Sequence, residues 1–264
     1  MAQEKTFRDI QVTSSQIAVR KIGVKDLVQA LRKGFDDFSA KPSHIVFLII
    51  IYPLFALLLT LFLAGQTLLH LAFPVVAGLT LLGPVVSVAL FEMSRRRESG
   101  LDTSWRSAFD FMHSASYAPI LALSLLMMLL YVAWLYMAQF IYFGLFGAVP
   151  LESVSDFTHQ LLTTRHGGAL IVYGTAVGLI FAIIALAISV VAFPLLLDRP
   201  ATTVTAVTTS IRAVTSNPLI MAVWGLIVVV LLAAGAAVFL VGLIVVLPVL
   251  GHATWHLYRR LVEP

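Results

Sequence analysis

The sequence predicts an all-α integral membrane protein with six transmembrane helices, arranged as three hairpins that are each preceded by a cytoplasmic interfacial amphipathic helix. Of the 264 residues, 60% are apolar and only 11% are charged, which is roughly half the charged share of a soluble domain. The apolar residues form long runs that match the thickness of a bilayer. The basic residues between these runs fall almost entirely on one predicted side.

Composition excludes several classes of protein. A soluble fold of this size could not bury so much apolar surface, and a chain with no cysteine is not a disulfide-stabilised secreted domain. The isoelectric point is near 9.5, but the basic residues flank apolar runs and lack the pattern of a nucleic-acid surface. We therefore expect contacts with anionic lipid head groups and no nucleic-acid partner.

Residues 1–43 are polar and form a predicted cytoplasmic segment without a cleavable signal peptide. Within it, apolar residues recur at helical spacing from about 24 to 38, and charged residues occupy the other faces. This pattern is too short and too polar to span a bilayer, so we predict an amphipathic helix that lies in the interface. Its apolar positions are Val24, Leu27, Val28, Leu31, Phe35 and Phe38.

Six apolar runs follow, and a cytoplasmic tail covers 259–264. The predicted spans are about 45–64, 68–92, 119–147, 169–197, 218–234 and 236–258. The stretch from Pro218 to Leu250 has no charged residue, and a single helix of that length would be about 50 Å long. We therefore divide it at Ala234-Gly235-Ala236, with a five-span arrangement as the alternative.

The basic residues favour six spans over five. All of the 17 lysines and arginines except Arg165 fall on one side of a six-span arrangement. The positive-inside rule then places both termini in the cytoplasm, as an even number of spans requires. A five-span chain would leave Arg259 and Arg260 on the opposite side.

The spans also carry an internal repeat. Each odd-numbered span is preceded by Ser/Thr-x-x-Pro, at Ser39–Pro42, Ser116–Pro119 and Thr215–Pro218. Each even-numbered span has a proline near its cytoplasmic end, at Pro84, Pro194 and Pro248. Because proline is tolerated in the first turn of a helix, the signature marks where an interfacial helix ends and the chain enters the membrane. The repeat predicts three similar units around a pseudo-threefold axis.

The N-terminal segment resembles a family of proteins. Val19-Arg20-Lys21-Ile22, the run from Asp26 to Phe38 and Pro42 are similar to an uncharacterised family of proteobacterial integral membrane proteins. The resemblance implies an inner-membrane location and no established activity. Some members carry the label cytochrome c oxidase subunit I, but no histidine lies in the middle of a predicted span here, as haem and copper ligation would require.

Two groups of residues are candidate sites. At the cytoplasmic ends of the even spans, Glu92, Asp198, His252 and His256 form a possible divalent metal site, because the two histidines lie four apart on one helical face. Polar capping of helix ends is the simpler interpretation. In the third span Gln139, Tyr131, Tyr136 and Tyr142 are the most polar mid-membrane residues, and an inter-helix hydrogen bond is favoured over a transport pathway.

Two other features are structural candidates. Gly174, Gly178 and Ala182 begin a stripe of small residues that permits close helix packing in the fourth span. The outer loop 150–168 predicts a short amphipathic helix, with Asp156 and His159 as a weak metal candidate.

No phosphate-binding loop, nucleophile elbow or mid-membrane charged residue is present in the sequence. We therefore expect a non-enzymatic accessory, assembly or scaffold component of a membrane complex, with no cofactor. A small transporter or channel with a pathway along the repeat axis is the first alternative. A metal-binding membrane enzyme is the second.

Overall fold

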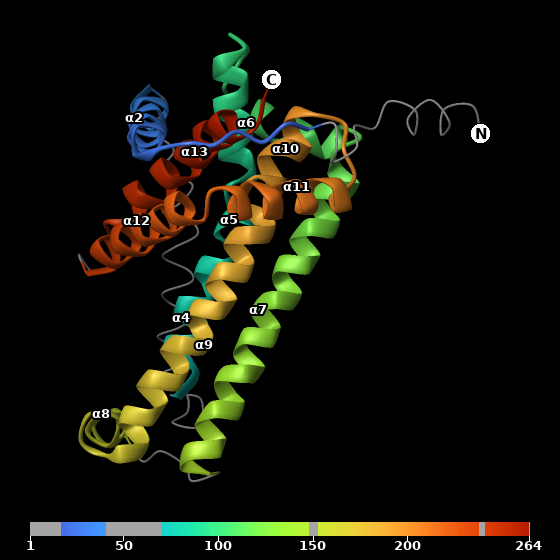
Figure 1. Cartoon of the computed structure of the whole chain (residues 1–264). Helices are drawn as coiled ribbons and strands as arrows, with labels where there is room; N and C mark the ends of the chain where they lie inside the picture. Colours follow the sequence, from blue (N-terminus) through green and yellow to red (C-terminus); the bar gives the residue numbers. More distant parts are fainter. Residues whose placement is uncertain (1–16, 41–69, 148–152, 238–240, 264) are drawn as a thin grey trace. The chain divides into compact units, whose positions relative to one another are not determined.

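The computed structural model describes residues 17–40, 70–147, 153–237 and 241–263. These residues form helices and no strand beyond an isolated antiparallel bridge between Val19 and Val262, so the all-α prediction is confirmed. With η for a 3₁₀ helix, the elements are α2 (Val24–Ala40), α4 (Ala72–Leu79), η3 (Thr80–Leu82), α5 (Gly83–Val86), α6 (Val88–Glu98), η4 (Ser107–His113), α7 (Tyr117–Phe146), α8 (Val154–Thr163), α9 (Arg165–Ser189), α10 (Ala192–Asp198), α11 (Thr203–Ser216), α12 (Pro218–Ala237) and α13 (Leu243–Leu261) (Figure 1).

Four stretches of the described residues are long and apolar enough to cross a membrane. They are Ala72–Glu98, Tyr117–Phe146, Arg165–Asp198 and Pro218–Ala237, and they overlap the predicted spans 68–92, 119–147, 169–197 and 218–234. The first predicted span, 45–64, lies outside the described residues. Helix α13 covers most of the predicted span 236–258 and is not among the four.

Prolines explain where these long stretches are interrupted. A proline removes the hydrogen bond to the carbonyl four residues earlier and crowds that carbonyl. The position four before Pro84 is Thr80, where α4 gives way to η3, and the position four before Pro194 is Val190, between α9 and α10. Pro248 lies close to the start of α13, and that helix continues through it.

The hairpin between α12 and α13 differs from its prediction. Helix α12 continues through the expected break at Gly235 and ends at Ala237. A Cβ atom added to Gly242 would lie 2.7 Å from the Gly235 Cα atom. A Cβ atom added to Gly235 would lie 3.1 Å from the Gly242 carbonyl carbon, so the two backbones approach each other closely at these glycines, and the helix does not break at Gly235.

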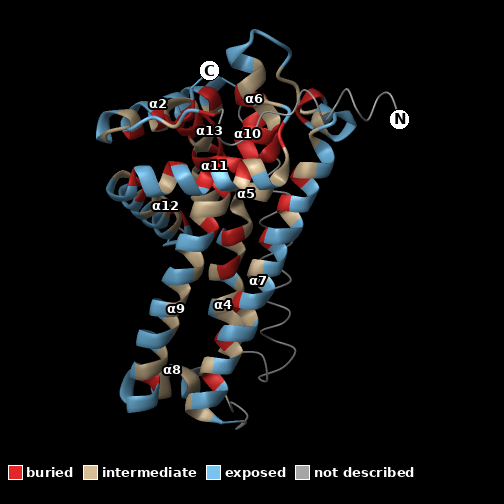
Figure 2. Cartoon of the chain, turned by 45° about the vertical axis from the view of Figure 1, so that its right-hand side comes forward, coloured by how far each residue is buried: buried red, intermediate tan, exposed pale blue. Residues whose placement is uncertain are grey.

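The described residues belong to two compact units, and each is considered by itself. One unit contains α2, α5, α6, η4, the start of α7, and α10 to α13. Helix α13 packs against α2, α6, α10 and α12 in this unit. Figure 2 shows buried residues concentrated over α6, α10 and α13, and the largest of them include Trp255, Tyr258, Phe91 and Phe193.

The other unit contains α4, η3, α8 and most of α7 and α9. Its described helices pack around Trp134 of α7, whose indole donates a 2.8 Å hydrogen bond to the Pro74 carbonyl oxygen of α4. Added Cβ atoms at Gly78 and Gly178 would meet the Trp134 ring at 2.5 Å and 3.2 Å. Glycine on both neighbouring helices therefore makes room for the indole.

The two ends of the chain are joined within the first unit. The Arg20 amide donates to the Leu261 carbonyl at 2.8 Å, and the Glu263 amide donates to the Ala18 carbonyl at 3.2 Å. Asn217, which precedes α12, accepts from the Ile22 amide and donates to the Arg20 carbonyl. Residues near both termini thus share one side of the protein.

Candidate functional site

A buried polar network joins α2, α6 and α13. Asp37 lies on the face of α2 that also buries Leu27, Ala30 and Gly34, and it points toward α13 because these positions recur at helical spacing. Its Oδ2 atom lies 2.6 Å from Ser94 Oγ and 2.8 Å from His256 Nε2. Its Oδ1 atom accepts a 2.8 Å hydrogen bond from Arg97. The carboxylate is therefore held by three side chains from two other helices.

His252 extends the network by one further hydrogen bond. Its Nδ1 atom lies 2.8 Å from Ser94 Oγ. Because a serine hydroxyl has one proton and Ser94 donates it to Asp37, the Nδ1 atom of His252 must be the donor to Ser94. The Nε2 atom then carries a lone pair, and this buried atom forms no hydrogen bond to any described residue.

The network shifts the pKa of two groups. Burial alone would raise the pKa of Asp37, but hydrogen bonds from His256 and Ser94 outweigh burial and hold it below 3.8. Burial lowers the pKa of His252 to about 4, and the charge on Asp37 opposes only part of that shift. At neutral pH, Asp37 is therefore ionised and His252 is neutral.

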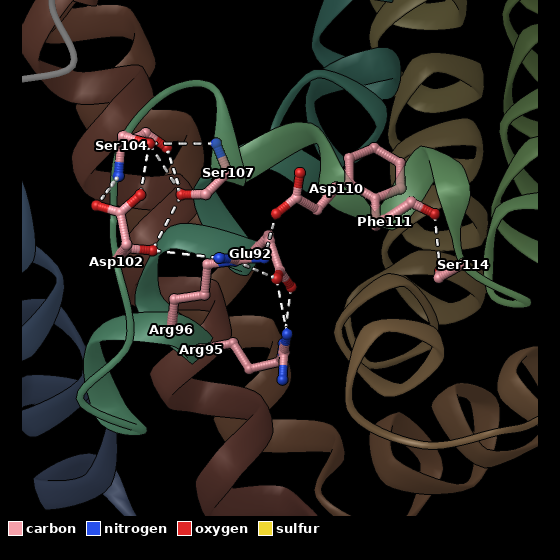
Figure 3. A network of polar contacts seen from close by, with 9 residues as sticks. All are labelled: Glu92, Arg95, Arg96, Asp102, Ser104, Ser107, Asp110, Phe111 and Ser114. Carbon is pink, nitrogen blue, oxygen red and sulfur yellow. Dashed lines mark hydrogen bonds and ion pairs between the residues drawn. The ribbon is translucent and has the colours of Figure 1, made fainter.

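Glu92 belongs to a separate ion-pair cluster on α6, shown in Figure 3. It accepts hydrogen bonds from Arg95 and Arg96 at 2.7 Å and 2.8 Å, and its side chain is only 3% exposed. Arg96 also donates to Asp110 of η4 at 2.7 Å. Both acids are thereby neutralised, and η4 is tied to the C-terminal end of α6.

Asp198, at the end of α10, belongs to a third polar group. It accepts a 2.6 Å hydrogen bond from the Tyr258 hydroxyl and lies 3.6 Å from Arg259 Nη1. Burial, reinforced by the charge on Asp198, raises the pKa of Tyr258 well above its ordinary value. Arg259 also pairs with Glu98 of α6, so α13 links α6 to α10.

The structure thus divides the four predicted metal ligands among three polar groups. His252 and His256 share one with Asp37, while Glu92 and Asp198 each pair with arginines. In the ranges that the structure describes, no set of three or more His, Asp or Glu side chains is arranged to hold a metal ion.

The predicted mid-membrane polar residues do not gather at one place. Tyr142 is buried and stacks on His70 at 4.2 Å and on Phe146 at 5.2 Å, whereas Tyr136 is 71% exposed. Tyr131 lies beside Gly78, and Gln139 is half-buried. The four residues therefore line no common path in the described part of the chain.

The small-residue stripe on α9 has one close contact. Gly178 faces Trp134, while nothing lies within 4 Å of a Cβ atom added to Gly174. Ala182 is half-buried one turn further along. The contact is internal to the chain.

The outer loop forms the predicted short helix, α8. Ser153 caps it by accepting from the Asp156 amide and donating to the Asp156 carboxylate at 2.7 Å. His159 lies by Thr163, and His166 contacts the Phe146 ring edge-on. These three polar side chains therefore have separate partners.

Sequence reasoning missed Asp37, Ser94 and Arg97. Asp37 continues the buried series Leu27, Ala30 and Gly34 at steps of three or four residues, so its register on α2 was the available signal. Ser94 and Arg97 carried no such signal, because their roles depend on which helix packs against α6.

Comparison with known proteins agrees with a membrane location. Residues 72–198 match the model of a family described as predicted integral membrane protein (DUF2189). This confirms the expected resemblance to an uncharacterised membrane protein family, although the match lies after the N-terminal stretch that suggested it. Neither a curated protein nor a solved structure matches the chain significantly.

Proposed function

We propose that this protein acts by association in the bacterial inner membrane, as a non-enzymatic accessory, assembly or scaffold component of a larger membrane complex. One observation carries the proposal. Leu129, Tyr136 and Phe140 recur on one face of α7, where they are 65%, 71% and 74% exposed. Lipid would satisfy the leucine and the phenylalanine, but not the tyrosine hydroxyl.

The depth of Tyr136 explains why. Helix α7 has 30 residues and is about 45 Å long, whereas the hydrocarbon core is about 30 Å thick. Tyr136 lies about 15 Å from the C-terminal end of α7. It is therefore deeper in the membrane than the head-group level, where tyrosines contact water. No described residue bonds to its hydroxyl. Because an unpaired hydroxyl in hydrocarbon is costly, we infer that a helix other than the described ones covers this face, and we propose that it belongs to a partner protein.

We also propose six passes with both termini in the cytoplasm. The bridge between Val19 and Val262 supports an even number of crossings between these residues. The four apolar stretches then require that the segment 45–64 and α13 both cross or that neither does. We propose that both cross, with α13 as the last pass and with the polar network at the cytoplasmic end of that helix.

The pseudo-threefold repeat is part of the same proposal. In the described residues, η4 precedes α7 and α11 precedes α12, as two repeats of an interfacial helix before an odd span require. The interruptions near Pro84 and Pro194 support equivalent even spans.

Site-specific photocrosslinking in native membranes tests the association. A photoreactive phenylalanine analogue replaces Phe140 in one strain and Leu179 of α9, which is 60% exposed, in a control strain. We expect one reproducible protein adduct from position 140 and lipid adducts from position 179. In unirradiated membranes solubilised in mild detergent, Tyr136→Phe should reduce recovery of the same protein without changing the melting temperature of this chain. Lipid adducts alone at position 140, or adducts only between copies of this chain, would overturn the proposal.

A further inference from the structure

Helix α2 presents three distinct faces. Leu27, Ala30, Gly34 and Asp37 are buried, and a Cβ atom added to Gly34 would lie 2.5 Å from the Ala253 nitrogen of α13. This face is therefore fixed against α13 at backbone contact distance. The rest of α2 is not needed for that contact.

A second face of α2 is apolar and exposed. Val24, Val28 and Phe35 are 56%, 58% and 54% exposed, and half-buried Leu31 lies among them. These positions follow the i, i+4, i+7, i+11 spacing of a continuous helical stripe. We call Val24, Val28, Leu31 and Phe35 the α2 stripe.

Two of the acidic residues of α2 form ion pairs with other helices, whereas its basic residues are exposed. Asp37 is paired with Arg97 and His256, and Asp26 lies 3.9 Å from Arg260. The exposed basic residues Lys25, Arg32 and Lys33 have no ion pair within the described residues, and Asp36 is the one acid left beside them. The helix has equal numbers of acidic and basic residues, but its outward surface is basic.

We propose that the α2 stripe is seated in the head-group region of an anionic bilayer leaflet, with Lys25 and Arg32, which border the stripe, contacting lipid phosphates. An apolar stripe bordered by long basic side chains is the arrangement that fits such a surface. Helix α13, which holds α2, also packs on the membrane-crossing candidate α12, so one helix separates α2 from a helix of spanning length. This surface is independent of the α7 face and of the proposed partner protein.

Spin labels on the full-length protein in lipid nanodiscs test the proposal. Since the chain has no cysteine, Val28→Cys and Gln29→Cys each create a single attachment point, on the stripe and on the adjacent polar face. Collisions with oxygen, which concentrates in lipid, and with a water-soluble nickel chelate distinguish lipid, water and protein surroundings. In nanodiscs of phosphatidylcholine with phosphatidylglycerol, we expect high oxygen and low nickel accessibility at position 28. Position 29 should show the reverse.

The contribution of charge is tested by the double variant Lys25→Gln and Arg32→Gln, labelled at position 28. In pure phosphatidylcholine we expect the label to insert less deeply than it does in the parent protein with phosphatidylglycerol present. Adding phosphatidylglycerol should deepen the insertion in the parent protein but not in the variant. High salt should remove that difference because it screens surface charges. High nickel accessibility at position 28 in all nanodiscs, or low accessibility to both reagents because protein covers the stripe, would overturn the proposal. Equal response of the double variant and the parent to phosphatidylglycerol would also contradict it.

Discussion

Ser94 Oγ lies 2.6 Å from Asp37 Oδ2, although 57 residues separate the two in the chain. Both side chains are buried, and within the described ranges the hydroxyl bridges Asp37 and His252. Since Asp37 is on α2 and His252 on α13, one serine of α6 fixes how three helices meet.

We predict that Ser94→Ala destabilises the protein. The change leaves the buried Nδ1 atom of His252 without a partner and removes one of the donors to Asp37, at a cost of about 1–3 kcal/mol. The measurement is thermal unfolding in detergent, compared with the parent. Ser99→Ala is the matched control because Ser99 is exposed at the end of the same helix. Equal melting temperatures for the two variants would contradict the bridging role of Ser94.

Stability should fall in mild acid. The pKa of His252 is about 4 in the fold and 6.5 in its ordinary state, so the unfolded chain binds more protons between these values. The contribution of neutral His252 to the free energy of unfolding is therefore fully present above pH 6.5. It is lost toward pH 4 by up to about 1.4 kcal/mol per pH unit. Asp37, whose pKa is lowered from 3.8, adds to the loss at still lower pH.

The variant His252→Asn isolates this effect. The asparagine amide can donate to Ser94 from near the position of Nδ1 but does not titrate. Denaturant titrations at several pH values should show a flatter stability profile between pH 6.5 and 4 for this variant. The exposed His113→Asn variant should keep the parent slope. An unchanged slope for His252→Asn would assign the acid sensitivity to other groups.

Composition and run length predicted the helical class and the apolar stretches well, because a bilayer requires long uninterrupted apolar helices. The prolines were also informative, since Pro84 and Pro194 act through the local backbone. Gly235 was misread as a helix break because its role comes from the approach of Gly242 across the hairpin.

The polar network could not be predicted because it depends on tertiary packing. Hydrophobic spacing placed Leu27, Val28 and Phe35 on one apolar face of α2, but only Leu27 of these is buried. The residues that contact α13 include small Gly34 and charged Asp37, which a hydrophobic pattern assigns to no core. The histidines at 252 and 256 were predicted as neighbours on one helical face, but the acid that His256 contacts, Asp37, is 219 residues away from it in the chain.

Gly34→Ala should separate α2 from α13. The added methyl group would meet backbone atoms of Ala253 at 2.5–2.7 Å, and backbone cannot rotate out of the way as a flexible side chain can. We expect a loss of about 1–3 kcal/mol and faster hydrogen exchange in α2. Gly144→Ala in α7 is the control, because nothing lies within 4 Å of its added Cβ atom. If both variants match the parent, the close crossing of α2 and α13 is incorrect.

Three glycines around Trp134 should respond in a graded way. An alanine at Gly78 meets the indole at 2.5 Å, one at Gly178 meets it at 3.2 Å, and one at Gly174 meets nothing within 4 Å. Melting temperature should therefore fall most for Gly78→Ala and less for Gly178→Ala. Gly174→Ala should be neutral or stabilising, because alanine favours a helix by about 1 kcal/mol over glycine. The reverse order at positions 174 and 178 would place the other glycine against Trp134.

The pairing of the two chain ends makes topology directly measurable. Val19 and Val262 form a bridge, so residues beside them must lie on the same side of the membrane whatever the number of passes. Single cysteines at Lys21 and Glu263 should react with an impermeant maleimide only after spheroplasts are permeabilised. A cysteine at Thr158 of α8 should react in intact spheroplasts, because the proposed topology places α8 on the side opposite the basic residues. Opposite labelling of positions 21 and 263 would require an odd number of crossings and would contradict the bridge.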